Sequence, residues 1–131
     1  MKKIQLPKST SQCNEQPHIE MKNSQVIIKY LYEDDFEEIS SLVSIKFKTV
    51  YSFTYTECEY INTLDYSFGL IEVDNSKMKS DLLTSWQLRN RPIDEAFGGE
   101  VEKIKHYRLY FDEYGMYDII CKGIEIEEEI K

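Results

Sequence analysis

Polar side chains alternate along one predicted strand and offer the first candidate chemistry in this sequence. His106, Arg108, Tyr110 and Asp112 are spaced two residues apart, and alternate residues of a β-strand project from the same face of the sheet. Such a stripe of imidazole, guanidinium and phenol groups can line a polar groove that binds an anion. The other interpretation, which the composition favours, is a solvated sheet face on which Arg108 or Lys122 pairs with nearby acidic residues.

Sequence motifs for metal, cofactor or nucleophilic chemistry are missing. Cys58 and Glu59 are adjacent, so on a strand their side chains point to opposite faces. No CxxC or HxxxH spacing supplies a zinc site. The sequence also lacks a GxSxG elbow, a phosphate-binding glycine loop and a GxGxxG fingerprint. We therefore predict no metal, no cofactor and no enzymatic activity.

An acidic segment lies between two apolar stretches. Five of the six residues from 33 to 38 are acidic, and their negative field can steer a basic partner and accelerate its association. They equally fit the beginning of a short helix, because carboxylates stabilise the positive end of the helix dipole. Asp34 or Asp35 would cap this helix, and Phe36 and Ile39 would begin its apolar stripe.

The composition predicts one acidic globular domain in a reducing compartment. A length of 131 residues fits a single domain, and 13% aromatic residues help to supply a core. The formal net charge of −8 disfavours direct binding to nucleic acid. The three cysteines are an odd number, which favours the cytoplasm over an oxidising compartment. Because no apolar run resembles a membrane span or a signal peptide, we expect a soluble cytoplasmic protein.

Strands must position most of these residues. Residues 1–24 lack a sustained period and contain Pro7 and Pro17, so we expect a flexible N-terminal arm and then a single domain over residues 25–131. Apolar alternation and β-branched residues predict the strands of this domain. They are expected at residues 25–32, 43–56 and 64–73, the last with a bend at Gly69, and in a hairpin over residues 106–126.

A helix is predicted between these strands. Asp74, Asn75 and Ser76 offer capping side chains, and an apolar stripe at helical spacing follows them. Trp86 falls in phase with this stripe, which favours a core position over a binding anchor. The stripe consists of Met78, Leu82, Leu83 and Trp86.

The hairpin has a register that the sequence predicts in detail. Asp112 and Gly115 suit the first and fourth positions of a type I turn closed by a left-handed glycine. The turn would pair Asp112 with Met116 and place apolar pairs on one face. We expect the acidic tail, residues 125–131, to fray. The predicted apolar pairs are Phe111 with Tyr117, Leu109 with Ile119 and Tyr107 with Cys121.

These elements predict an α+β domain. Neighbouring strands joined by short connections favour a mostly antiparallel, curved sheet of about five strands. One main helix would pack on this sheet, and a second, short helix would follow the first strand. No internal repeat is visible in the sequence.

Three segments resemble those of small bacterial immunity proteins of contact-dependent and related polymorphic toxin systems. They are residues 45–51 (IKFKTVY), 70–76 (LIEVDNS) and 106–115 (HYRLYFDEYG), and the resemblance spans roughly residues 43 to 126 as a pattern typical of a fold. It implies a cytoplasmic single-domain protein that binds a cognate toxin domain and blocks its active site or substrate entry. It carries over no catalytic residues.

The leading functional hypothesis is therefore an inhibitory binding protein for a basic, nuclease-type toxin domain, since an acidic protein associates rapidly with a basic one. The alternative is a small-ligand protein or enzyme with a pocket inside the curved sheet, lined by Tyr51, Phe53 and Tyr107. A structural module of a larger phage or host assembly is a third possibility. For the first hypothesis the predicted partner-binding residues are Glu33, Asp34, Asp35, Glu37, Glu38, Tyr60 and Tyr114.

Overall fold

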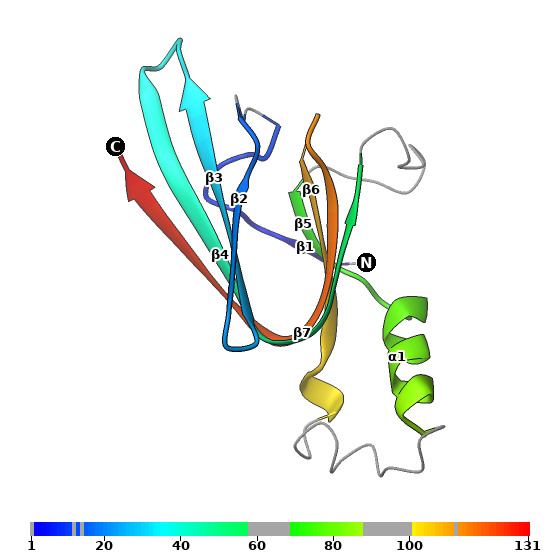
Figure 1. Ribbon diagram of the computed structural model, residues 1–131. Helices are drawn as coiled ribbons and strands as arrows, with labels where there is room; N and C mark the ends of the chain where they lie inside the picture. The colour runs from blue at the N-terminus through cyan, green and yellow to red at the C-terminus, as the bar shows by residue number, and fades with distance from the viewer. Residues whose placement is uncertain (1, 12, 14, 58–68, 88–100, 112) are drawn as a thin grey trace.

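Seven antiparallel strands form one sheet in the computed structural model, in the order β1-β5-β6-β7-β4-β3-β2 (Figure 1). The structure describes residues 2–11, 13, 15–57, 69–87, 101–111 and 113–131. The elements in chain order are β1 (Lys2–Ile4), β2 (His18–Lys22), β3 (Gln25–Asp34), β4 (Ile39–Thr56), β5 (Gly69–Glu72), helix α1 (Lys77–Gln87), the short 3-10 helix η2 (Val101–Lys103), β6 (Lys105–Phe111) and β7 (Gly115–Ile130).

The α+β class and the mostly antiparallel sheet are confirmed, but the sheet has seven strands among the described residues rather than about five. The segment expected as a flexible arm supplies both outermost strands, β1 and β2. Residues between them are also held, because the Thr10 hydroxyl donates to the Tyr110 carbonyl at 2.6 Å and the Tyr30 hydroxyl to the Lys8 carbonyl at 2.7 Å. Backbone groups of an open sheet edge accept a strand of almost any sequence. Side-chain periodicity therefore did not predict β1 and β2.

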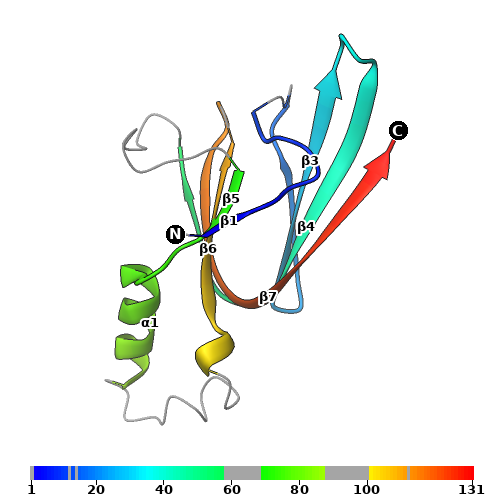
Figure 2. The same cartoon turned by 180° about the vertical axis from the view of Figure 1, so that it is seen from behind.

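The two longest strands divide the sheet into two halves that face each other. Figures 1 and 2 show β4 and β7 turning together at one place, so that the sheet is folded over rather than evenly curled. A register shift in β4 between Val50 and Ser52 and a left-handed backbone at Thr49, with φ of 54°, interrupt the ladder. Such bulges bend a strand. The first half contains β2, β3, the beginning of β4 and the end of β7. The second half contains β1, β5, β6, the end of β4 and the beginning of β7.

The main core fills the space between the two halves. Tyr30 from β3 meets Phe111 from β6 edge to face, with ring centroids 5.4 Å apart. Phe47 and Tyr107 meet across the interior with their rings tilted at 53° and their centroids 6.2 Å apart. Aromatic pairs at these separations add to the stabilisation from buried area. The other buried members of this cluster are Val26, Ile28, Val43, Ile45, Leu70, Leu109, Tyr117, Ile119 and Cys121.

The predicted second helix is wrong. Residues 35–38 form the turn between β3 and β4, and β4 already begins at Ile39. The pairing of Asp34 with Ile39 closes a tight hairpin, and Glu38 has a positive φ of 55° that no helix permits. A helix this short has little stability of its own, so strand pairing on both sides decides the conformation.

The predicted faces of the β6–β7 hairpin are confirmed, but its predicted register is wrong by two residues. Met116 pairs with Tyr110 instead of Asp112, and Phe111 pairs with Gly115. Gly115 does have the left-handed backbone that was expected, with φ of 93°. A slip of two residues returns every side chain to its own face, so the apolar alternation alone could not distinguish the two registers. Leu109 now pairs with Tyr117, and Tyr107 with Ile119.

The end of β7 is not frayed. It remains paired with β4 as far as Ile130, which lies opposite Ser41. The described part of β6 pairs only with residues 115–121 of β7. Beyond Gly123, therefore, β4 is the one strand partner of β7 within the part of the chain that the structure describes.

Helix α1 confirms the predicted helix and lies against the outer side of the second half of the sheet (Figure 2). Met78, Leu82 and Leu83 pack on a small second cluster around the buried residues Ile104 and Ile120. Ser76 caps the helix, since its Oγ accepts a hydrogen bond from the backbone N–H of Lys79 at 3.0 Å. The side chain of Trp86 and residues 64–68 of the predicted third strand lie outside the described residues, whereas Gly69 has the left-handed φ of 107° expected at a bend.

Candidate functional site

The turn between β3 and β4 is the first candidate site, and we call its four residues, Asp35, Phe36, Glu37 and Glu38, the acidic tip. All four are exposed. The carboxylate of Asp34 shapes the turn, because its Oδ1 accepts hydrogen bonds from the backbone N–H groups of Phe36 at 3.0 Å and Glu37 at 3.3 Å. The turn thereby has a defined conformation of its own before any partner binds.

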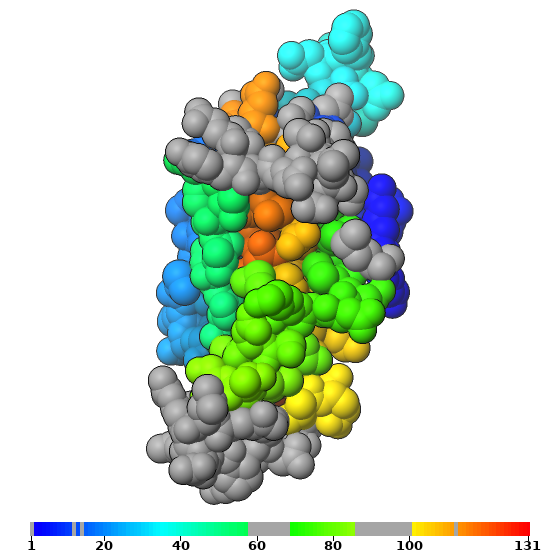
Figure 3. Space-filling model, turned by 90° about the vertical axis from the view of Figure 1, so that its right-hand side faces the viewer, coloured from blue at the N-terminus to red at the C-terminus, as the bar shows by residue number. Residues whose placement is uncertain are grey.

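Phe36 distinguishes the acidic tip from an ordinary solvated turn. Its side chain is fully exposed, at the end of a hairpin that projects beyond the body of the protein (Figure 3, cyan). Holding a whole phenyl ring in water costs free energy that burial against a partner would recover, at about 25 cal/mol per Å² of apolar surface. The helical spacing of the sequence assigned Phe36 to the stripe of a short helix, so its exposure in a turn was not predicted.

The carboxylates at the tip create a negative field that reaches the adjoining strand. The Tyr32 hydroxyl donates a hydrogen bond to Asp34 Oδ2 at 3.5 Å. Desolvation, together with the nearby carboxylates of Asp34 and Glu37, raises the pKa of Tyr32 above its ordinary value. An approaching cation would be attracted by the same charges.

The other predicted contact residues are only partly brought together. Glu33 and Asp34 are half-buried at the end of β3, directly below the tip. Tyr114, which was expected to be an exposed aromatic anchor, is half-buried and packs against the main core, and its contact with a partner stays a prediction. Both hairpin turns nevertheless lie at the same end of the molecule (Figure 1). Tyr60 lies outside the described residues.

A second candidate site lies where β6, β7 and the beginning of α1 meet, and we call its four side chains, Ser76, His106, Arg108 and Asp118, the polar network. His106 is buried, and its two ring nitrogens lie 2.6 Å from Ser76 Oγ and 2.6 Å from Asp118 Oδ1. Arg108 Nε donates to the same Asp118 oxygen at 2.9 Å. The predicted pairing of Arg108 with an acidic residue is thus found in this structure.

The prediction that this stripe lies on a solvated face is wrong, however. His106, Tyr110 and Asp118 are buried, and Met78, Leu82 and Leu83 of α1 pack on this side of the strands, around Ile120. Burial alone would raise the pKa of Asp118, but hydrogen bonds from His106 and Arg108 outweigh it and hold this pKa below its ordinary value. Asp118 is therefore an ionised group inside the protein. Asp112 lies outside the described residues.

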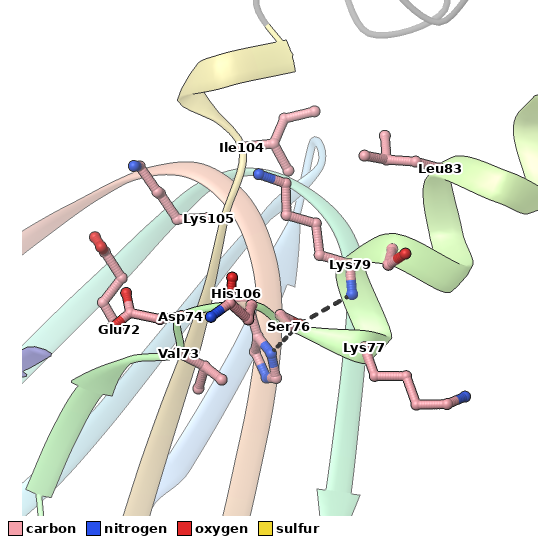
Figure 4. Close-up of a pocket in the computed structure, with 12 residues that line it drawn as sticks. Glu72, Val73, Asp74, Ser76, Lys77, Lys79, Leu83, Ile104, Lys105 and His106 are labelled. Carbon is pink, nitrogen blue, oxygen red and sulfur yellow. Dashed lines mark hydrogen bonds between the residues drawn. The ribbon is translucent and has the colours of Figure 1, made fainter. Parts of the chain in front are cut away.

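A cavity of about 600 Å³ opens beside the polar network (Figure 4). Figure 4 shows the imidazole of His106 pointing from β6 toward Ser76 at the beginning of α1. Sequence spacing could not find this site, because Ser76 and His106 are 30 residues apart and Asp118 a further 12. The sequence contains two separate signals, the polar stripe that includes His106 and Arg108 and the capping side chain of Ser76, and nothing in the spacing joined them.

The aromatic pocket of the alternative hypothesis does not form. Phe53 and Tyr107 belong to the main core, whereas Tyr51 packs with the second cluster under α1. The register shift between Val50 and Ser52 changes the face to which neighbouring residues of β4 project. These three rings therefore line no common cavity.

The two cysteines that the structure describes, Cys13 and Cys121, have no disulfide partner there. Burial raises the pKa of the Cys121 thiol to about 12 and that of Cys13 to about 11, so both stay protonated and unreactive at neutral pH. No group of three or more His, Cys, Asp or Glu side chains in the described ranges is placed to hold a metal ion. Within these ranges, no helix has the length and apolar character needed to cross a membrane.

Comparison with known proteins gives no further guide to the site. No family model matches the chain, and neither a curated protein nor a solved structure does so. The functional argument therefore depends on the acidic tip and the polar network themselves.

Proposed function

We propose that this protein is a cytoplasmic immunity protein that binds a basic toxin domain of the nuclease type and neutralises it through the acidic tip. The observation that carries this proposal is the fully exposed Phe36 between acidic neighbours at the end of a projecting hairpin. Binding energy at protein interfaces concentrates in aromatic anchors that become buried. Carboxylates around such an anchor select a basic partner.

The charge of the whole chain supports the same partner. A formal net charge of −8 attracts a basic protein and can raise the association rate constant by 10-fold or more at low salt. A nuclease must attract the phosphates of its substrate, so its cleft presents cations. The carboxylates of Asp35, Glu37 and Glu38 would take the place of those phosphates.

The shape of the tip supports inhibition by insertion. Two paired strands are only about 5 Å apart, so a hairpin end is narrow enough to enter a substrate cleft. The Asp34 hydrogen bonds to the turn fix its backbone in advance, which reduces the entropy lost on binding. Phe36 would then bury its ring inside the cleft while the carboxylates contact its cationic walls.

A photo-crosslinking experiment in the native cell tests this proposal. A photoreactive amino acid replaces Phe36 in the full chain, and in a matched control it replaces Tyr55, another exposed aromatic residue. We expect position 36 to crosslink a basic protein that position 55 does not. The captured protein is then purified, and its cleavage of DNA and RNA is measured with and without this chain.

The inhibition assay decides the outcome. Wild-type protein should abolish cleavage, and Phe36→Ala should weaken inhibition by about 30-fold, which corresponds to the 2 kcal/mol typical of an interface anchor. Met21→Ala, which removes an exposed apolar side chain on β2, should leave inhibition unchanged. A crosslinked partner that is acidic, or whose activity this chain does not inhibit, would overturn the proposal.

A further inference from the structure

We propose that Ser76, His106 and Asp118 form a hydrolytic site for small carboxylic esters, with Ser76 as the nucleophile, at the cavity beside α1. This activity goes beyond the proposed binding function and uses a different part of the molecule. The inference rests on three side chains in hydrogen-bonded series and on the cavity that Ser76 and His106 both line.

The order of the three groups is the one that serine hydrolysis needs. A nucleophile, a base and a group that orients the base must lie within hydrogen-bond reach of one another, and both distances here are 2.6 Å. Because Asp118 is an ionised acceptor, it takes the N–H of His106 Nε2 and leaves Nδ1 free to accept the Ser76 proton. The ring nitrogens exchange the places they have in serine proteases, yet either nitrogen of an imidazole can act as the base.

The position of Ser76 favours its alkoxide. It lies at the beginning of α1, where the helix dipole stabilises negative charge, and the Lys79 N–H already donates to its Oγ. The backbone N–H groups of the first helical turn lack acceptors within the helix, and under this proposal those of Lys77 and Met78 stabilise the oxyanion. Ser76 itself is half-buried rather than sealed.

The cavity determines the class of substrate. Its volume of about 600 Å³ admits a small molecule, and Leu83 and Ile104 supply an apolar wall for an acyl group. Charged groups of both signs surround this wall. They are Lys77, Lys79 and Lys105 on one hand and Glu72 and Asp74 on the other.

The reaction is balanced by the three residues and water. Ser76 Oγ bonds to the ester carbonyl carbon while its proton passes to His106 Nδ1, and the carbon–oxygen bond to the alcohol then breaks. The departing alcohol takes that proton. Water next attacks the acyl group, gives one proton to His106 and releases the carboxylic acid, after which His106 returns the proton to Ser76. Asp118 stays ionised and stabilises the transient imidazolium.

A covalent probe of serine nucleophiles tests the inference on the full chain. Wild-type protein is incubated with a fluorophosphonate and digested, and the modified residue is identified by mass spectrometry. We expect one label per chain, on Ser76, and a stoichiometric burst of p-nitrophenol from p-nitrophenyl acetate. Ser85→Ala, which changes an exposed serine of α1 outside the lining of the cavity, should leave both unchanged.

Ser76→Asn is the decisive variant, because Asn retains helix capping but removes the nucleophile. With the far-UV circular dichroism of the wild type, it should lose the label and at least about 100-fold in p-nitrophenyl acetate hydrolysis. Folded wild-type protein that is neither labelled nor active would overturn the inference, as would Ser76→Asn that hydrolyses the ester at the wild-type rate. Either failure leaves the proposed binding function untouched, because that function depends on Phe36 and not on this cavity.

Discussion

The acidic tip and Asp118 place the same functional group in opposite surroundings. At the tip, the carboxylates of Asp35, Glu37 and Glu38 lie in water, where salt screens them and hydrogen bonds to solvent satisfy them. Asp118 is buried at 4% exposure and bonded to both His106 and Arg108. The charges at the tip are thus available to a partner, whereas the charge of Asp118 already belongs to an internal network.

This difference predicts where a mutation affects folding and where it affects binding. Removing an exposed carboxylate changes the unfolding free energy little, because water solvates that carboxylate in both the folded and the unfolded chain. Removing a buried one leaves its partners without compensation in a medium that solvates them poorly. Stability measurements on the two regions should therefore diverge strongly.

Asp118→Ala should give the largest effect. It leaves His106 and Arg108 without their shared acceptor, and we expect the unfolding free energy to fall by about 3 kcal/mol. Urea denaturation followed by circular dichroism measures this change. Asp35→Ala at the tip is the matched control and should remain within about 0.5 kcal/mol of wild type. Equal losses in the two variants would show that the regions do not differ as described.

Acid titration should give the next largest effect. The pKa of Asp118 is lower in the folded chain than its ordinary value, so this group stabilises the fold above the unfolded-state pKa near 4. That contribution is lost as the pH falls from about 4 through the folded pKa. Urea denaturation of wild type and Asp118→Asn between pH 7 and pH 2 compares the two curves. The wild-type curve should fall more steeply below pH 4, and parallel curves would contradict the lowered pKa.

Ser76→Ala should have a smaller effect. It removes the cap of α1 and the contact with His106, and a lost helix cap costs about 1 kcal/mol of unfolding free energy. Thermal or urea denaturation measures it. Ser76→Asn restores a capping side chain and should recover most of the loss. A loss in Ser76→Asn as large as in Ser76→Ala would mean that the cap is not what Ser76 contributes to stability.

Charge reversal at the tip should change stability least. Asp35→Lys combined with Glu37→Lys should alter the unfolding free energy by less than about 0.5 kcal/mol, since both side chains are exposed. The same variant should associate with the crosslinked basic partner about 10-fold more slowly at low salt, by stopped-flow fluorescence. Raising the ionic strength should remove most of that difference. An association rate that is unchanged at low salt would exclude the tip from the encounter.

Local periodicity predicted the elements whose own residues determine them. Val26, Ile28 and Tyr30 alternate in sequence and are all buried in β3, and the stripe from Met78 to Leu83 does cover the second cluster. The class of the fold followed from such patterns. The register of the last hairpin did not, since slips of two residues preserve the faces of Phe111 and its neighbours.

Features that depend on residues distant in the sequence could not be predicted from local patterns. The strands β1 and β2 form because a sheet edge is available to them, and nothing in their side-chain pattern required it. The short helix failed because the pairing of Asp34 with Ile39 overrides local preference. For the candidate sites, the acidic character of the tip was predicted, but the exposure of Phe36 and the meeting of Ser76 with His106 needed the folded chain.

The last part of β7 has a consequence for the behaviour of the protein in a crowded cell. Beyond Gly123 this strand has β4 as its one strand partner among the described residues, so its other side is a sheet edge within that part of the chain. Glu125, Glu127 and Glu129 follow one another along this stretch, and a second copy added edge to edge would bring identical charges together. Mutual repulsion of this kind disfavours the edge-to-edge joining of open strands.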